Sequence, residues 1–180
     1  MIDAKNRKTP RFPPDKEPIA ARAIVAVLDE FAASRRDLGI TEGACGGDLL
    51  FAEALLDRGA AIELRLPFDE PTFLRKSVDF EKAPSTMPDR WHERFMKVKA
   101  HAKILVMPDI LGPTPDGASP YERCNLWMLE DALRIGPEKL CFICLWDGGG
   151  GDGPGGTRHM VEAVCARGGE VRWLDVTKLW

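Results

Sequence analysis

A chain of 180 residues with 44% hydrophobic and 29% charged residues has the composition of one globular domain with a proper core. Its formal net charge of −3 argues against a general nucleic-acid-binding protein, which usually carries a basic surplus. No apolar stretch approaches the roughly 20 residues that span a bilayer, and the polar N-terminus shows no signal peptide. We therefore expect a cytoplasmic protein without a membrane partner.

Residues 1–17 contain three prolines and predict an extended arm, and residues 18–180 predict a single domain. Apolar spacing predicts helices over residues 19–36, 48–59, 70–78, 90–102, 121–136 and 157–169. Strands are predicted over residues 61–67, 103–109, 139–146 and 170–176, with a shorter extended piece before residue 48. Helices and strands in alternation predict an α/β fold, Rossmann-like, with three α/β/α layers and a mainly parallel sheet.

The run LWDGGGGDGPGGTRHMVEA, residues 145–163, places seven glycines between Gly148 and Gly156. A flexible linker would have polar, structureless flanks, whereas this run joins a predicted strand to a predicted helix. A strand, a glycine-rich turn and a helix N-terminus form an anion-binding arrangement, because free N–H groups and the helix dipole face the turn. The run therefore predicts a phosphate-binding turn, with a mobile surface loop as the alternative.

A second turn of this kind follows the extended piece before residue 48. It contains Gly43, Cys45, Gly46 and Gly47, and the predicted helix begins at Asp48. In a parallel sheet such turns share the C-terminal edge, where ligands bind, although the sequence does not show that the two turns are adjacent. Neither turn is a G-x-G-x-x-G fingerprint or a P-loop, so P-loop NTP hydrolysis is not predicted.

Polar residues beside the two turns have two interpretations each. Asp48 is either a helix N-cap or a ligand for ribose or a metal ion. Thr157 is either an N-cap or a residue whose hydroxyl donates a hydrogen bond to phosphate. Asp147 is either a ligand for ribose or metal or an ordinary turn residue. Trp146 is the best candidate to stack on a base, although tryptophans on apolar faces are more often core residues.

Five cysteines in a chain with cytosolic features predict free thiols. Cys141 and Cys144 match C-x-x-C, but they lie inside a predicted strand, where residues three apart point to opposite faces. We interpret them as buried structural residues. No histidine spacing typical of a metal site is present, so no metal is predicted.

Three blocks carry a resemblance to a known family: GACGGDLLFAEALLDRGAAIELRLPFD, YERCNLWMLEDAL and WDGGGGDGPGGTRHMVEA. Together they resemble the SLOG superfamily, the Rossmann-like group that contains the LONELY GUY phosphoribohydrolases and the DNA-processing protein DprA. The likeness is closest to SLOG-like modules beside cyclase or tetratricopeptide-repeat regions of bacterial signalling proteins, and it covers nearly the whole chain.

The resemblance implies a nucleotide or nucleotide-derived ligand at the C-terminal edge of the sheet. It implies that Gly46, Gly47 and Asp48 lie at one end of the ligand, and that Arg123 and Asn125 reach the same crevice. The residues implied around phosphate are Gly153, Pro154, Gly155, Gly156 and Thr157.

The chain also departs from the family pattern. The phosphoribohydrolases carry P-G-G-x-G-T-x-x-E, whereas Arg158 and His159 stand here in place of the inner Gly-Thr pair. Glu162 keeps the ninth position and is the candidate catalytic residue, with an exposed helix carboxylate as the alternative. Family members usually begin with an apolar strand, so the resemblance leaves open that one central strand and part of the pocket are missing.

These observations leave three hypotheses. The first is a domain that binds or senses a nucleotide-type ligand, with no other cofactor expected. The second is an enzyme that hydrolyses an N-glycosidic bond in a nucleotide, and the third is a non-catalytic scaffold with a degenerate pocket. A homo-oligomer is compatible with all three.

Overall fold

The structure is a computed structural model that describes residues 1–149 and 156–180. Its strands are β1 (Leu38–Thr41), β2 (Ala61–Leu66), β3 (Lys103–Val106), β4 (Cys141–Trp146) and β5 (Glu170–Asp175). All paired strands run parallel, in a sheet of order β1-β2-β3 and a second sheet of β4 and β5. The α/β fold class with parallel strands is therefore confirmed, and the strands divide between two sheets.

Helices connect the strands throughout the described part of the chain. The longer ones are α1 (Glu17–Glu30), α2 (Gly47–Leu56), α4 (Trp91–Lys99), α6 (Pro120–Ile135) and α7 (Thr157–Cys165). The shorter ones are η1 (Pro14–Lys16), α3 (Glu70–Phe73), the π-helical η2 (Leu74–Val78), α5 (Met107–Leu111), η3 (Pro137–Lys139) and α8 (Val176–Leu179).

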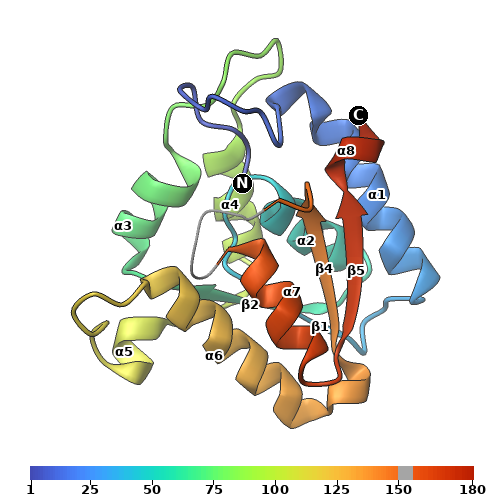
Figure 1. The fold of residues 1–180 in the computed structure, drawn as a ribbon, viewed down its shortest axis with the longest axis vertical. Coiled ribbons are helices and arrows are strands. Elements are labelled where there is room, and N and C mark those ends of the chain that lie inside the picture. The colour runs from blue at the N-terminus through green and yellow to red at the C-terminus, as the bar shows by residue number, and fades with distance from the viewer. Residues whose placement is uncertain (150–155) are drawn as a thin grey trace.

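Helices cover the strands on two sides, which gives the three layers. In Figure 1, α7 lies in front of β4 and β5, and α2 lies behind them. Helix α2 also contacts α1, α4, β1 and β2, whereas α6 contacts α7, β1 and β2. The main core between these elements includes Leu49, Leu64, Leu66, Phe73 and Phe95, all of which are fully buried.

Two element boundaries differ from the sequence prediction for local reasons. Helix α1 ends at Glu30 instead of residue 36, because the Ser34 N–H donates to Asp37 Oδ2 at 2.7 Å and closes a separate turn. Strand β3 ends at Val106 instead of residue 109, because Pro108 lacks an N–H for the ladder and lies in the first turn of α5.

Residues 1–17 pack onto the domain instead of extending from it. Ile2 and Phe12 belong to the main core and are 2% and 5% exposed. Asp3, itself buried, accepts hydrogen bonds from the N–H groups of Arg11 at 2.9 Å and Phe12 at 3.0 Å. The segment is therefore anchored to the core through Ile2 and Phe12, while residues 4–10 between them are exposed.

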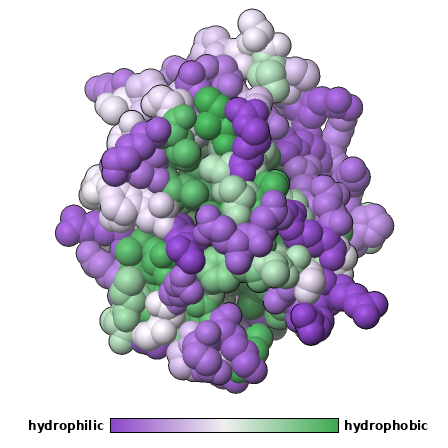
Figure 2. Space-filling view, turned by 90° about the vertical axis from the view of Figure 1, so that its right-hand side faces the viewer, coloured by the Kyte–Doolittle hydropathy of each residue, from purple (hydrophilic) through white to green (hydrophobic). Residues whose placement is uncertain are grey.

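The face that carries α1 and β5 shows apolar residues in patches above and below a band of hydrophilic residues (Figure 2). On these elements Val25, Phe31 and Trp173 are exposed, and the Arg172 guanidinium lies 4.9 Å from the centre of the Phe31 ring. Isolated exposed apolar side chains are ordinary on a monomer, so the homo-oligomer stays a prediction.

Candidate anion-binding site

The turn between β1 and α2 is built from glycines that other residues could not replace without strain. Gly43 and Gly46 have φ values of 84° and 110°. A Cβ on Gly43 would lie 3.0 Å from Leu64, and a Cβ on Gly46 would lie 2.9 Å from the Ile2 nitrogen. The predicted turn therefore exists, and its outer side is covered by residues from the N-terminal segment.

Helix α2 begins without a side-chain cap. Its N-cap is Gly46, so the N-cap interpretation of Asp48 is wrong by two positions. Asp48 Oδ2 instead accepts a hydrogen bond from the Ala44 N–H at 3.2 Å. Within the described residues, the N–H groups of Gly46, Gly47 and Asp48 donate to no partner, which leaves donors at the positive end of the helix dipole.

Cys45 lies inside the turn with its side chain buried. Its thiol is fully buried, and burial raises its pKa to about 11. Its N–H donates to the Ser77 carbonyl at 2.9 Å, and its carbonyl accepts from the Ile2 N–H at 3.0 Å. Both backbone groups are therefore used inside the fold, and Cys45 has no free donor for a ligand.

The second turn begins after β4, where Asp147 Oδ1 accepts from the Gly149 N–H at 2.9 Å, as in an ordinary turn. The predicted site residues Gly153, Pro154 and Gly155 lie outside the described residues. Helix α7 starts after Gly156, which is its N-cap and carries no side chain, so the N-cap interpretation of Thr157 is wrong by one position.

The start of α2 lies beside the end of β4, which the sequence could not establish. A Cβ on Gly47, the first residue of α2, would lie 3.3 Å from the Leu145 side chain near the end of β4. At the other side, His159 in the first turn of α7 lies 3.7 Å from Glu122 in the first turn of α6. The N-terminal ends of α2, α6 and α7 therefore converge at this edge.

Glu42, the first residue after β1, is a site residue that the sequence analysis missed. It is 8% exposed, and its Oε1 has no hydrogen-bond partner in the described part of the chain. Burial, and next to it the negative charge of Asp48, raise the pKa of Glu42 well above its usual value, although the Cys124 thiol opposes this. Its position in the sequence, as a polar residue directly after a strand at the C-terminal edge of the sheet, could have indicated it.

Residues of α6 lie beside the Glu42 carboxyl. Burial, and after it the charge of Glu42, raise the pKa of the Cys124 thiol, which donates to the Arg65 carbonyl at 3.3 Å. Burial also raises the pKa of Tyr121, whose hydroxyl lies 3.3 Å from the Ser77 hydroxyl. The Glu42 carboxyl therefore lies near a thiol and a phenol hydroxyl, both of which are neutral when protonated.

Three other predicted site residues are already engaged. The Arg123 guanidinium donates to the carbonyls of residues 111, 112 and 113 at 2.6–2.9 Å, so contact with a ligand would require these bonds to break. Trp146 donates through Nε1 to the Gly149 carbonyl at 3.1 Å, and its ring packs against Trp173. Asn125 lies half-buried on α6. None of these contacts tests a ligand role.

Glu162 lies on the exposed side of α7 and pairs with Arg158 Nε at 2.9 Å, with side-chain exposures of 63% and 58%. An i, i+4 pair of this kind is a common feature of a surface helix. The geometry agrees with the alternative interpretation of an exposed helix carboxylate and adds nothing to the catalytic one.

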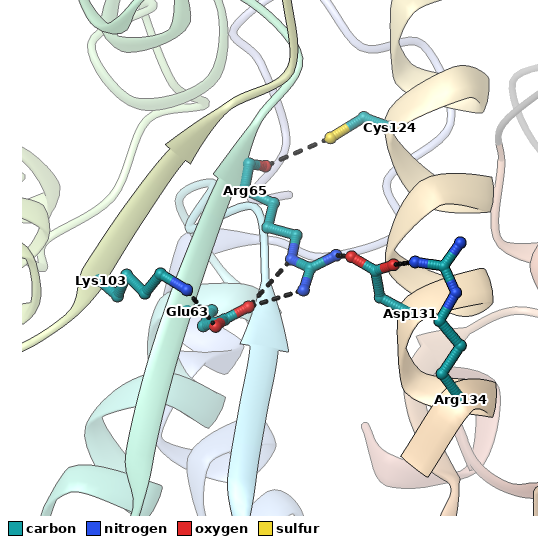
Figure 3. A network of polar contacts seen from close by, with 6 residues as sticks. All are labelled: Glu63, Arg65, Lys103, Cys124, Asp131 and Arg134. Atoms are coloured by element: carbon teal, nitrogen blue, oxygen red, sulfur yellow. Dashed lines mark hydrogen bonds and ion pairs between the residues drawn. The ribbon is translucent and has the colours of Figure 1, made fainter. Parts of the chain in front are cut away.

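An ion-pair network around the buried Arg65 joins β2 to α6 (Figure 3). Arg65 on β2, 5% exposed in its side chain, contacts Glu63 at 2.6 Å and Asp131 on α6 at 2.5 Å. Lys103 also pairs with Glu63 at 3.1 Å, and Arg134 pairs with Asp131 at 2.6 Å. Burial opposes ionisation of Glu63, but the hydrogen bonds from Arg65 and Lys103 outweigh it and lower its pKa. The network fixes α6, and with it Cys124 and Tyr121, against the sheet.

All five cysteines are free thiols, and burial raises the pKa of Cys141 to about 11 and of Cys144 to about 12. Among the described residues, no three His, Cys, Asp or Glu side chains gather into a possible metal site. The same part of the chain contains no helix with the length and apolar character to span a membrane.

Comparisons with known proteins give no family. No protein family and no curated protein matches this chain. One solved structure, a cystathionine beta-synthase from Bacillus anthracis, is similar at 13% identity with a TM-score of 0.24. The match covers 88% of this chain and 64% of that chain, so this chain spans less than two thirds of that protein's length.

Proposed function

We propose that this chain is a SLOG-like module that binds a nucleotide or nucleotide-derived ligand, with its phosphate at the N-terminal ends of α7 and α2. The observation that carries the proposal is the start of α7. Among the described helices of eight or more residues, α7 alone has neither a side-chain cap nor an acidic residue in its first turn. That turn instead carries Arg158 and His159.

An anion would stabilise such a helix end. The unpaired N–H groups and the dipole place roughly half a positive charge there, and nothing in the first turn of α7 offsets it. The neighbouring end of α2 adds the N–H groups of Gly46, Gly47 and Asp48. Two helix ends that face one edge of a parallel sheet form the arrangement in which phosphates bind.

Binding without turnover is the function that the geometry supports best. The Glu162 carboxylate pairs with Arg158 on the exposed side of α7. No contact of the described residues favours the hydrolase or the scaffold over the binding module, so both enter as outcomes of the experiment.

The experiment is mass spectrometry of small molecules released by denaturing freshly purified protein, with Gly156→Asp and Gly156→Ser as variants. Gly156 has φ −75° and ψ 171°, an extended conformation that both replacements adopt without strain. Each side chain can cap α7, but only aspartate places a negative charge where the phosphate would lie. We expect wild type to release an intact nucleotide, Gly156→Ser to release less and Gly156→Asp to release none.

Other results assign the function differently. A free base together with a ribose phosphate would identify a hydrolase, and the same products lost in Glu162→Gln would make Glu162 catalytic. Equal release from wild type and Gly156→Asp would place the ligand elsewhere. If wild type releases nothing and binds no nucleotide at millimolar concentration, the scaffold replaces the binding module.

A further inference from the structure

We propose that Glu42 is a ligand-binding residue of this site, whose buried carboxyl group hydrogen-bonds to a phosphate oxygen at the N-terminus of α2. The inference rests on the proposed function and extends it to a buried residue. It also gives the site a hydrogen-bond donor that depends on pH.

The position of the carboxyl carries the argument. Glu42 directly precedes the glycine turn, and its carboxyl lies near Asp48 in the first turn of α2 and Cys124 in α6. Oε1 is closed to solvent and has no partner among the described residues. A buried polar atom without a partner costs about 1–3 kcal/mol, so a native protein that keeps one calls for an explanation such as a ligand.

The chemistry of the carboxyl selects the ligand group. A neutral carboxylic acid has one O–H donor, whereas a carboxylate only accepts. The neighbouring N–H groups of Gly46, Gly47 and Asp48 are also donors, and they favour an anion. Donors that converge at a helix N-terminus recognise an acceptor with several oxygens, and a phosphate monoester fits that description.

The charged and titratable groups around Glu42 come from three elements. Asp48 of α2 disfavours its ionisation, whereas the Cys124 thiol of α6 and the amino group of Met1 favour it. The charge of Glu42 in turn raises the pKa of Tyr121 of α6. Burial is the largest cause and keeps the neutral form. A phosphate bound nearby adds negative charge and strengthens this preference.

The N-terminal segment lies over the glycine turn that follows Glu42. The backbone of Met1 and Ile2 covers Gly46, with the Ile2 nitrogen 2.9 Å from the position of a Cβ on that glycine. The Ile2 N–H holds this segment to the turn through the Cys45 carbonyl at 3.0 Å. A phosphate that binds the Gly46 N–H would therefore lie beside these two residues.

The experiment measures binding of ribose 5-phosphate, the part shared by nucleotide-derived ligands, by calorimetry between pH 6 and pH 9. Ribose without phosphate is the control ligand. Glu42→Gln keeps the shape and an N–H donor but does not titrate, and Glu42→Leu keeps the volume without a donor. The second pKa of the phosphate lies near 6, so ionisation of the ligand changes the affinity of every variant equally. The ratio of the wild-type affinity to the Glu42→Gln affinity at each pH therefore isolates the contribution of Glu42.

We expect wild type and Glu42→Gln to bind alike at pH 6. The wild-type affinity should then fall relative to Glu42→Gln as the pH rises, and Glu42→Leu should bind about tenfold more weakly at pH 6. A constant ratio of wild type to Glu42→Gln, together with full affinity in Glu42→Leu, would overturn the role of Glu42 and leave the proposed function intact. Absence of ribose 5-phosphate binding in wild type would overturn both.

A second measurement covers the case in which Glu42→Leu does not fold. The ¹³C resonance of the Glu42 side-chain carboxyl in wild type reports its protonation and its contacts directly. The resonance should move when ribose 5-phosphate is added and stay fixed when ribose is added. A resonance that both additions leave unchanged, while calorimetry detects binding, contradicts the inference.

Discussion

Replacing Arg65 by methionine tests whether the buried network holds α6 against the sheet. The substitution removes the guanidinium that joins Glu63 on β2 to Asp131 on α6, at 2.6 Å and 2.5 Å. Methionine keeps an aliphatic side chain of adjustable shape in the same space. The change in stability therefore reports the loss of the charge contacts more than the loss of volume.

The structure sets the size of the effect. Breaking a buried ion pair costs about 3–5 kcal/mol when the remaining charge has no other partner. Here Glu63 keeps Lys103 at 3.1 Å and Asp131 keeps Arg134 at 2.6 Å, which lowers the cost. The lost contact between Arg65 and the Trp127 ring, at 4.6 Å, raises it again. We expect Arg65→Met to lose about 2–3 kcal/mol, equivalent to about 4–12 °C in Tm.

Chemical denaturation followed by circular dichroism measures this loss, with Lys103→Met as the matched control. Lys103 contacts the same Glu63 carboxylate, but its side chain is 64% exposed. An exposed pair contributes about 0.2–1 kcal/mol, so the control should lose no more than that. If Arg65→Met costs no more than Lys103→Met, burial of the network contributes nothing and the reasoning fails.

Two further predictions concern the glycine turn. Gly46→Ala should lose about 1–3 kcal/mol because its φ of 110° and ψ of −131° lie in a region that residues with a Cβ rarely adopt, and more through the Cβ contact with the Ile2 nitrogen. Gly112→Ala is its control, because Gly112 also has a positive φ, 77°, but no atom lies within 4 Å of a Cβ built on it. Equal losses of unfolding free energy in the two variants, measured by chemical denaturation, would mean that the contact with the Ile2 nitrogen adds nothing. Because the pKa of Glu42 is raised in the folded state, that state holds a proton that the unfolded chain loses above about pH 4.3, and stability falls as pH rises. Wild type should therefore lose stability relative to Glu42→Gln, by up to about 1.4 kcal/mol per pH unit, until the pKa of Glu42 is passed. Parallel pH profiles of stability for wild type and Glu42→Gln would refute this prediction.

The fold followed from the sequence because the strands are short apolar runs and the helices carry apolar stripes. These patterns depend on the spacing of apolar residues along the chain, which follows from whether one or two faces of a helix or strand are buried. Boundaries were less predictable where side chains compete with the backbone, as at Ser34, or where a proline ends a ladder, as at Pro108. The caps of α2 and α7 were misplaced because glycine, with no side chain to cap with, starts both helices.

The site was less predictable than the fold. The glycine turn between β1 and α2 was predicted from its composition, but its position beside the end of β4 depends on tertiary packing. The second predicted turn lies mostly outside the described residues. Glu42 and Arg65 were missed because charged residues are rarely buried without partners, so sequence patterns place them at the surface. Only the tertiary structure shows that one is buried with an unpaired oxygen and the other inside a network.

The charge balance of the edge gives a physical reason for a neutral Glu42. With both Glu42 and Asp48 ionised, two carboxylates would lie beside the N-terminus of α2 and repel a phosphate. With Glu42 neutral, the carboxylate that remains beside the N-terminus of α2 is that of Asp48, which the Ala44 N–H engages. Within the described residues, the N–H groups of Gly46, Gly47 and Asp48 stay unpaired there. On the proposed function, protonation of Glu42 and phosphate binding favour each other, because each removes a repulsion that the other would meet. The burial that makes Glu42 costly for the free protein is, by this reasoning, the feature that lets an acidic chain of net charge −3 bind an anion at this edge.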